Sequence, residues 1–334
     1  MLIELISNYG LFLLKTLTVV IGIIVILSFA LSSKKSKSEG NLVVTNVNEE
    51  LDNLENNIKQ NILNKKDFKK YIKDKKKNNK VAEKKLFILD FKGNIKASEI
   101  VSLRREISGI LLSYKKGDEV ILRLENSGGT VHEHGLAASQ LKRIKDKKIP
   151  LTICVDKVAA SGGYMMACVA NKIVSSPFAI IGSIGVLAQV PNFNKLLKNK
   201  GIDFEQHTAG NYKRTVTMFG KNTEKDRKKL GEQLEDIHLL FKDFIVSQRK
   251  NIDIEKVATG EYWYGKSALK LNLIDEIMTS DEYILSIKDK FKIFHIKYKP
   301  VTSFADKISK VSSKIVNKLF YKFAQKNYDS SLFK

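Results

Sequence analysis

Cysteine is scarce in this sequence, with only Cys154 and Cys168 among 334 residues. Both lie within apolar runs, which favours buried free thiols over a disulfide, and so they do not report the redox compartment. The five histidines form no HExxH motif, and no CxxC pair accompanies them. The sequence therefore indicates no metal site, and we expect no cofactor.

Acidic residues are also in short supply, because 58 Lys and Arg oppose 36 Asp and Glu and give a formal net charge of +22. Such an excess is typical of nucleic-acid binding, of contact with an anionic membrane surface, or of a lysine-biased composition. The most basic segment, residues 59–85, contains no known nucleic-acid-binding motif. We therefore expect no nucleic acid among the partners.

Residues 10–31 form a long apolar run in which Lys15 is the one charged residue. As a helix, this run would span roughly 33 Å, enough for a hydrocarbon core of about 30 Å. The pattern predicts an N-terminal membrane anchor over residues 1–31, with the lipid bilayer as a partner through residues 10–31. The alternative is a cleaved signal peptide with its processing region at residues 28–33.

Residues 32–85 differ sharply from the anchor, because Ser, Asn, Lys and Glu dominate them. Too few apolar residues are present to offset the entropy of ordering such a segment. The composition predicts a Lys-rich linker or N-terminal extension, with one amphipathic helix around residues 51–62.

Globular patterning begins at residue 86, where apolar strand-like runs alternate with segments of helical spacing. The predicted strands are residues 86–91, 120–124, 151–155 and 172–174, and the predicted helices include residues 100–114 and 136–144. This alternation predicts an α/β fold with a largely parallel sheet.

A long helix is predicted to begin after Thr223, since Thr223 and Asp226 have the spacing of a capping box. We place the globular domain at residues 86–290. Residues 291–334 are predicted to form a basic, amphipathic tail, suited to a surface or to a membrane interface.

Two glycine-rich loops follow predicted strands, at residues 126–129 and 161–163. Loops at the carboxyl ends of parallel strands tend to build the functional site, and glycine lets their N–H groups approach a developing oxyanion. Ser161 opens a helix, where negative charge is favoured. The residues around it are equally typical of an ordinary N-cap serine followed by a packing glycine pair.

A nucleophilic serine needs a base, and the residues alone leave that base open. His132 and His134 follow the first glycine loop, where they are also typical of surface or helix-start histidines. Lysine serves when burial lowers its pKa by roughly 3.4 units, or about 4.6 kcal/mol. Lys213 follows a strand-like stretch, residues 203–208, but nothing local distinguishes it from the other lysines.

Five motifs in order make residues 86–277 resemble the signal peptide peptidase A family, and most closely its SohB branch. The motifs are V-A-A-S-G-G-Y at 158–164, G-S-I-G-V at 182–186, G-N-Y-K-R at 210–214, T-G-E-Y-W-Y-G-K-S-A at 259–268 and L-I-D-E at 273–276. The resemblance implies a serine endopeptidase with a Ser–Lys dyad. Ser161 then corresponds to the nucleophile, Lys213 to the general base, and Ser183 to the serine that supports the base.

The same resemblance assigns an oxyanion hole to the backbone N–H groups of Gly128, Gly129 and Gly162. The chain departs from the family here, because the family usually has Ser-Pro-Gly-Gly where this sequence has Asn126-Ser127-Gly128-Gly129. Loss of the proline makes the loop less rigid without removing the backbone donors.

The resemblance further implies a crotonase- or Clp-like α/β superhelix of ββα units, assembled into a ring-shaped homo-oligomer that acts on peptide or protein substrates. In single-unit members of the family, the serine of one protomer is expected to pair with the lysine of its neighbour. The implied location is the bacterial inner membrane, as a single-pass protein with the domain on the periplasmic side. Lys34, Lys35 and Lys37 favour the cytoplasmic side, and long domains often override that rule.

Two other functions fit parts of the pattern. The crotonase-like fold also carries acyl-CoA enzymes, which need neither a Ser–Lys pair nor a membrane anchor. A non-catalytic membrane scaffold could retain the same fold.

Overall fold

The computed structural model describes residues 8–20, 22–23, 40–78 and 83–300. Residues 8–20 are helical. Among the described residues, no helix has both the length and the apolar character needed to cross a bilayer. Residues 1–7, 21 and 24–31 of the predicted anchor lie outside the described part, as does the signal-peptide processing region.

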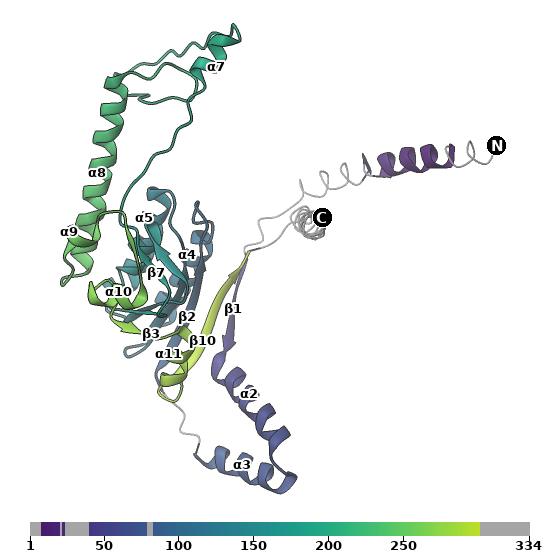
Figure 1. The fold of residues 1–334 in the computed structure, drawn as a ribbon. Coiled ribbons are helices and arrows are strands. Elements are labelled where there is room, and N and C mark those ends of the chain that lie inside the picture. Colours follow the sequence, from purple (N-terminus) through teal and green to yellow (C-terminus); the bar gives the residue numbers. More distant parts are fainter. Residues whose placement is uncertain (1–7, 21, 24–39, 79–82, 301–334) are drawn as a thin grey trace, which may run out of the picture. The chain divides into compact units, whose positions relative to one another are not determined.

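A seven-stranded sheet forms the centre of residues 42–298 (Figure 1). Its spatial order is β1 (Asn41–Asn46), β10 (Lys292–Lys299), β2 (Lys85–Lys92), β3 (Glu119–Glu125), β4 (Leu151–Val155), β6 (Lys172–Ser175) and β9 (Glu276–Ile277). The ladder from β10 to β9 is parallel throughout. The predicted α/β class with a parallel sheet is therefore confirmed.

The strands bury both faces, as the alternation of side chains requires. In β2, Phe87 and Leu89 enter the larger core cluster, whereas Leu86 and Ile88 enter the smaller one. The larger cluster lies under α4 (Ile100–Ser113), α5 (Val131–Asp146) and α6 (Gly162–Ala167), and the smaller under α11 (Ser280–Ile287). Both cysteines are buried free thiols, as predicted.

A second sheet holds three short strands, in the order β5 (Val158–Ala160), β7 (Ile180–Gly182) and β8 (Tyr262–Tyr264). β5 and β7 are parallel, and β8 is antiparallel to β7. β5 begins two residues after β4, so the chain passes from the large sheet straight into the small one. No pattern in the sequence predicts this sheet, because three-residue strands are too short to show a period.

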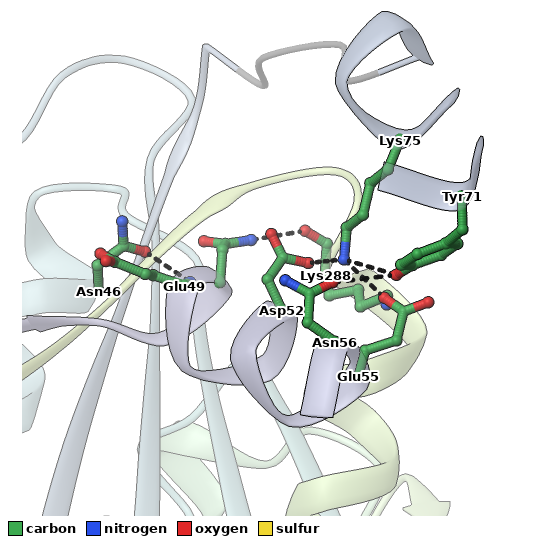
Figure 2. A network of polar contacts seen from close by, with 9 residues as sticks. Asn46, Glu49, Asp52, Glu55, Asn56, Tyr71, Lys75 and Lys288 are labelled. Carbon is green, nitrogen blue, oxygen red and sulfur yellow. Dashed lines mark hydrogen bonds and ion pairs between the residues drawn. The ribbon is translucent and has the colours of Figure 1, made fainter. Parts of the chain in front are cut away.

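The segment predicted as a linker is ordered over residues 41–78. It contains β1 and two helices, α2 (Val47–Ile62) and α3 (Lys65–Asn78), so the predicted helix at 51–62 is confirmed and extended. Lys75 of α3 reaches back to α2, with its Nζ 2.8 Å from both Asp52 and Glu55, and Tyr71 donates to Asn56 (Figure 2). Composition does not reveal these contacts between α2 and α3, which is why it predicts a linker.

The sheet also continues beyond residue 290, where the sequence analysis ended the domain. β10 pairs with β2 over four residue pairs from Lys292↔Lys85 to His295↔Ile88. Asn48 fixes this strand to α2, because its Oδ1 accepts from the Ile293 N–H at 2.6 Å. The rest of the predicted tail, residues 301–334, lies outside the described residues.

The longest helix, α8 (Glu224–Gln248), begins at the predicted capping box of Thr223 and Asp226. Only Phe241 and Ile245, in its C-terminal half, are fully buried in the core. Its N-terminal half projects away from the sheet together with α7 (Asn194–Asn199), as Figure 1 shows. The remaining helices are α9 (Ile254–Val257) and α10 (Gly265–Lys270).

Candidate functional site

Two neighbouring parallel strands bring Ser161 and Ser183 together. Ala160 of β5 is in register with Gly182 of β7, and each serine is the next residue of its chain. The Ser161 N–H donates to the Gly182 carbonyl at 2.7 Å. The motifs V-A-A-S-G-G-Y and G-S-I-G-V, whose serines are 183 − 161 = 22 positions apart, therefore meet at one sheet end.

Ser161 has an unusual backbone conformation, with φ 53° and ψ −120°. A positive φ is costly for a residue with a side chain, and such strain recurs at functional sites. Ser161 precedes the first turn of α6, but its side chain makes no capping hydrogen bond there. The simple N-cap interpretation of this serine therefore finds no support, and its half-buried hydroxyl stays available.

The loop Asn126–Gly129 lies directly against Ser161. Asn126 forms an isolated parallel bridge with Ala159, and its carbonyl accepts from the Ala160 N–H at 3.0 Å. A Cβ added to Gly128, which has φ 91°, would lie 2.7 Å from the Ser161 Cβ and 3.0 Å from the Gly162 nitrogen. Only glycine fits at this position, so the two predicted glycine loops form one site.

The three predicted oxyanion donors are not equivalent. The Gly128 N–H donates to the Asn126 Oδ1 at 2.6 Å, so it is already engaged in this conformation. Within the described part of the chain, the N–H groups of Gly129 and Gly162 meet no hydrogen-bond acceptor. These two groups remain as donors beside Ser161.

The two histidines near this loop have opposite environments. The His132 side chain is 80% exposed, as expected for a surface residue. His134 lies in the first turn of α5, as a helix-start histidine would, but it is completely buried and so is not a surface residue. A Cβ on Gly162 would lie 2.4 Å from its Cγ, so the ring packs beneath the residue that follows Ser161.

Lys213 lies on the projecting part of the chain and is exposed. The preceding residue, Tyr212, packs beneath Lys225 and Lys229 of α8, whose Nζ atoms are 5.8 and 5.0 Å from the ring centroid. Lys229 precedes Phe241, the first fully buried residue of α8, by three helical turns, or roughly 18 Å. Within the described chain, no hydrogen bond joins Lys213 to Ser161 or to Ser183.

The stretch before Lys213 is not a strand, as its sequence had suggested. Residues 202–208 have no regular secondary structure, and all are exposed. Apolar side chains such as Ile202 and Phe204 alternate there at a period of two, and they mimic a strand without a neighbouring strand to pair with.

A polar cavity of about 580 Å³ lies at the carboxyl ends of β10, β2 and β3 and contains neither Ser161 nor Lys213. Asp90 in its wall accepts from Arg123 at 2.6 Å and lies 2.9 Å from His295. Although burial opposes ionisation, these two partners keep the pKa of Asp90 well below its usual range.

Glu106, in the same wall, has a pKa shifted in the opposite direction. Burial raises its pKa from 4.5 to about 7, although the Tyr298 N–H donates to its Oε1 at 2.7 Å. Its Oε2 is buried without a hydrogen-bond partner in the described structure.

No group of metal-ligating side chains occurs among the residues that the structure describes. The two thiols are far from reactive, because burial raises the pKa of both Cys154 and Cys168 to about 12. The chemistry that the site can support therefore rests on the hydroxyl of Ser161, whose backbone is strained, and on backbone N–H donors. The base must come from another part of this chain or from a second copy.

Comparison with known proteins matches residues 4–141 to the model of "Peptidase family S49 N-terminal" and residues 143–293 to that of "Peptidase family S49". The chain is 50% identical over 309 residues to a "Probable protease SohB" of Buchnera aphidicola subsp. Schizaphis graminum, with 88% of this chain and 90% of that protein aligned. It is 42% identical to a "Probable protease SohB" of Haemophilus influenzae, with 98% of each covered.

Among solved structures, a "1510-N membrane-bound stomatin-specific protease S97A mutant" aligns with a TM-score of 0.42 at 14% identity, and it covers 62% of this chain and 85% of that one.

Proposed function

This chain belongs to peptidase family S49, the family of the SohB proteases, and we propose that it hydrolyses peptide bonds with Ser161 as nucleophile and Lys213 as general base. That it is a peptidase follows from the family. The identity of the dyad, the oligomer and the membrane anchor are the parts that we propose.

The observation that carries the proposal is the setting of Ser161. Its positive φ of 53° is maintained by the bond from its N–H to Gly182 and by the glycine loop that lies against its Cβ. A backbone strained in this way at a helix start directs a hydroxyl outward beside free N–H groups. Ser183, the other serine at this sheet end, has a similar φ of 51°.

The reaction follows from these groups. Neutral Lys213 takes the proton of Ser161 as its Oγ attacks the peptide carbonyl carbon, and the carbonyl oxygen becomes an oxyanion. The Gly129 and Gly162 N–H groups stabilise that oxyanion. Protonated Lys213 then gives its proton to the leaving amine, and water releases the acyl group by the reverse sequence. Ser183 hydrogen-bonds the lysine and holds it in place.

Exposure of Lys213 supports a dyad shared between protomers. A lysine acts as a base near neutral pH only when its ammonium is desolvated, and Lys213 is exposed within its own chain. A second protomer that covers the projecting part would bury Lys213 of the first protomer against Ser161 and Ser183 of the second. A closed ring of such heterologous contacts fills every site equally.

The remaining features fit a protease that works at a membrane. Residues 10–31 would anchor the chain in the bacterial inner membrane with the catalytic domain on the periplasmic side, and membrane-associated peptides or proteins are the substrates. The order β4, β5, α6 supports the ββα unit that we propose for a crotonase-like superhelix. A non-catalytic scaffold would need neither the strained serine nor the free N–H groups beside it. An acyl-CoA enzyme could also use such N–H groups to stabilise an oxyanion, but it would need no Ser–Lys pair.

A fluorophosphonate probe tests the proposal directly, because it reacts only with an activated serine. The full-length protein should be labelled and should cleave fluorescent casein, and Ser161→Ala should lose both properties while keeping its melting temperature. Ser139→Ala, which removes the hydroxyl of an exposed serine of α5 outside the site, is the matched control. Casein cleavage by Ser161→Ala at the rate of the unmodified protein would overturn the assignment.

A further inference from the structure

A buried histidine is connected to the catalytic loop through one side chain. The Oδ1 of Asn126 accepts from the Gly128 N–H at 2.6 Å and lies 3.1 Å from the Nε2 of His134. The other ring nitrogen, Nδ1, lies 2.9 Å from the Thr130 carbonyl oxygen. Asn126 is 1% exposed and His134 is 0% exposed, so water competes for none of these contacts.

Hydrogen-bond chemistry fixes the direction of the central contact. Since the Gly128 N–H donates to Oδ1, rotating the Asn126 amide would place an NH₂ group against that N–H, which is a clash of two donors. Oδ1 is therefore an acceptor, and Nε2 of His134 must carry the hydrogen that it receives. The other ring nitrogen, Nδ1, faces the Thr130 carbonyl oxygen, so both nitrogens have a polar neighbour.

We propose that His134 is a positioning residue for the oxyanion loop, acting through the bond from its Nε2–H to Asn126 Oδ1. This inference rests on the proposed function of Ser161. Held by His134, the Asn126 side chain closes a local turn on the Gly128 N–H, a conformation that asparagine supports well. The loop is thereby fixed against Ser161, although the sequence has no proline there to stiffen it.

A second contact reinforces the same role. The His134 ring packs so closely beneath Gly162 that a methyl group there would lie 2.4 Å from Cγ. The ring therefore supports both segments whose N–H groups face the oxyanion, the loop at Gly128–Gly129 and the start of α6. Because a displacement of about 1 Å can cost about 100-fold in rate, rigid support at this point matters for turnover.

Three substitutions in the full-length enzyme separate positioning from mere packing. His134→Gln places an amide nitrogen near the position of Nε2 and can still donate to Asn126. His134→Asn places its nitrogen near Nδ1, from which it reaches Thr130 but not Asn126. His134→Phe fills the ring's space and donates to neither. With a fluorogenic peptide as substrate, we expect His134→Gln to stay within about threefold of the unmodified kcat, and His134→Asn and His134→Phe to lose about 10- to 100-fold with little change in KM.

The Asn126 link has its own test. In the Asn126→Ala background, adding His134→Phe should not lower kcat further. The hydrogen bond between His134 and Asn126 is already absent from that variant. Equal activity of His134→Asn and His134→Gln, or fully additive losses in the double variant, would overturn the proposal.

Nuclear magnetic resonance of the protein labelled with ¹⁵N at histidine keeps the inference testable even where a variant does not fold. The unmodified protein should show an Nε2-bound proton at His134 that exchanges slowly with water, and Asn126→Ala should speed that exchange. An unprotonated Nε2 would refute the assigned bond. This readout needs no activity, so failure of Ser161 as nucleophile, seen with Ser161→Ala, is distinguishable from failure of the His134 assignment.

Discussion

Tyr164 donates its hydroxyl hydrogen to the carbonyl oxygen of Leu273 at 2.9 Å, in the interior of the protein. Tyr164 closes the motif that begins at Val158, and Leu273 opens the motif L-I-D-E. Two of the sequence motifs, separated by 109 positions, are thus tied together directly beneath the start of α6. Burial raises the pKa of Tyr164 far above its usual range, so the hydroxyl remains a donor at any physiological pH.

Tyr164→Phe should therefore destabilise the domain, because the Leu273 carbonyl would be left buried without this donor. The expected cost is about 1–3 kcal/mol of unfolding free energy, measured by urea denaturation of the full-length protein. Tyr262→Phe is the matched control, since Tyr262 is 55% exposed and should change stability by less than about 0.5 kcal/mol. Equal stability of the two variants would show that the Tyr164 bond contributes nothing.

Much of the fold was predictable from local pattern. The strands at 85–92, 119–125 and 151–155 are short, continuous apolar runs, and the helix after Thr223 has its capping box in the sequence. The edge of the sheet was not predictable, because β10 finds its partner β2 more than 200 positions earlier in the chain. No local period reports such a pairing.

The site was predictable only in part, because it too depends on contacts between segments that are distant in the sequence. Ser161 and the two glycine loops stand at strand ends, where chemistry is expected, but nothing in the sequence says that Ser161 and Ser183 share a register. The sequence does not predict the burial of His134, because that burial depends on the approach of Gly162 from another segment. Its one sequence signal is that it follows Asn126 by 8 residues, from a strand end into the first turn of a helix.

The identity of the general base gives a second prediction. Lys213→Arg should reduce casein cleavage to background, because arginine keeps the positive charge but does not deprotonate at accessible pH. His132→Ala should retain most activity, since that side chain is exposed and lies outside the proposed dyad. Activity of the unmodified enzyme should rise with pH as the lysine loses its proton. Inactive His132→Ala beside active Lys213→Arg would point to histidine as the base.

Glu106 leads to a prediction about pH and stability. Its pKa is about 7 in the folded protein against 4.5 ordinarily, so the folded state binds the proton more tightly than the unfolded state. The free energy of unfolding contributed by this group is therefore present below pH 4.5 and is lost as pH rises towards 7 and beyond. Glu106→Gln, which stays neutral and can still accept from Tyr298, should raise stability at pH 8 by roughly 1–3 kcal/mol and change it little at pH 4.5.

Urea denaturation of the full-length protein at both pH values checks this expectation. Glu235→Gln, which neutralises an exposed carboxylate of α8, controls for the change in net charge. A stabilisation of the same size at pH 4.5 and at pH 8 would contradict the assigned cause, because it would not follow the ionisation of Glu106.

The shared dyad gives the last prediction, which concerns assembly. Ser161 lies at the end of β5 in the core of the domain, whereas Lys213 lies beside the projecting start of α8, exposed in its own chain. If one protomer supplies the serine and its neighbour the lysine, two different inactive chains can complement each other. Ser161→Ala chains keep an intact lysine, and Lys213→Ala chains keep an intact serine, so a mixed ring contains some complete sites.

Co-expressed with different affinity tags and purified through both, such mixed assemblies should recover part of the activity, whereas each variant purified alone should be inactive. With random mixing in equal amounts, about one quarter of the contacts pair an intact serine with an intact lysine, so recovery of roughly one quarter of the unmodified rate is expected. The double variant Ser161→Ala/Lys213→Ala, mixed with either single variant, is the control and should recover nothing. Mixed assemblies that co-purify and yet stay inactive would place the dyad within one protomer, and the roles of Ser161 and Lys213 themselves would stand.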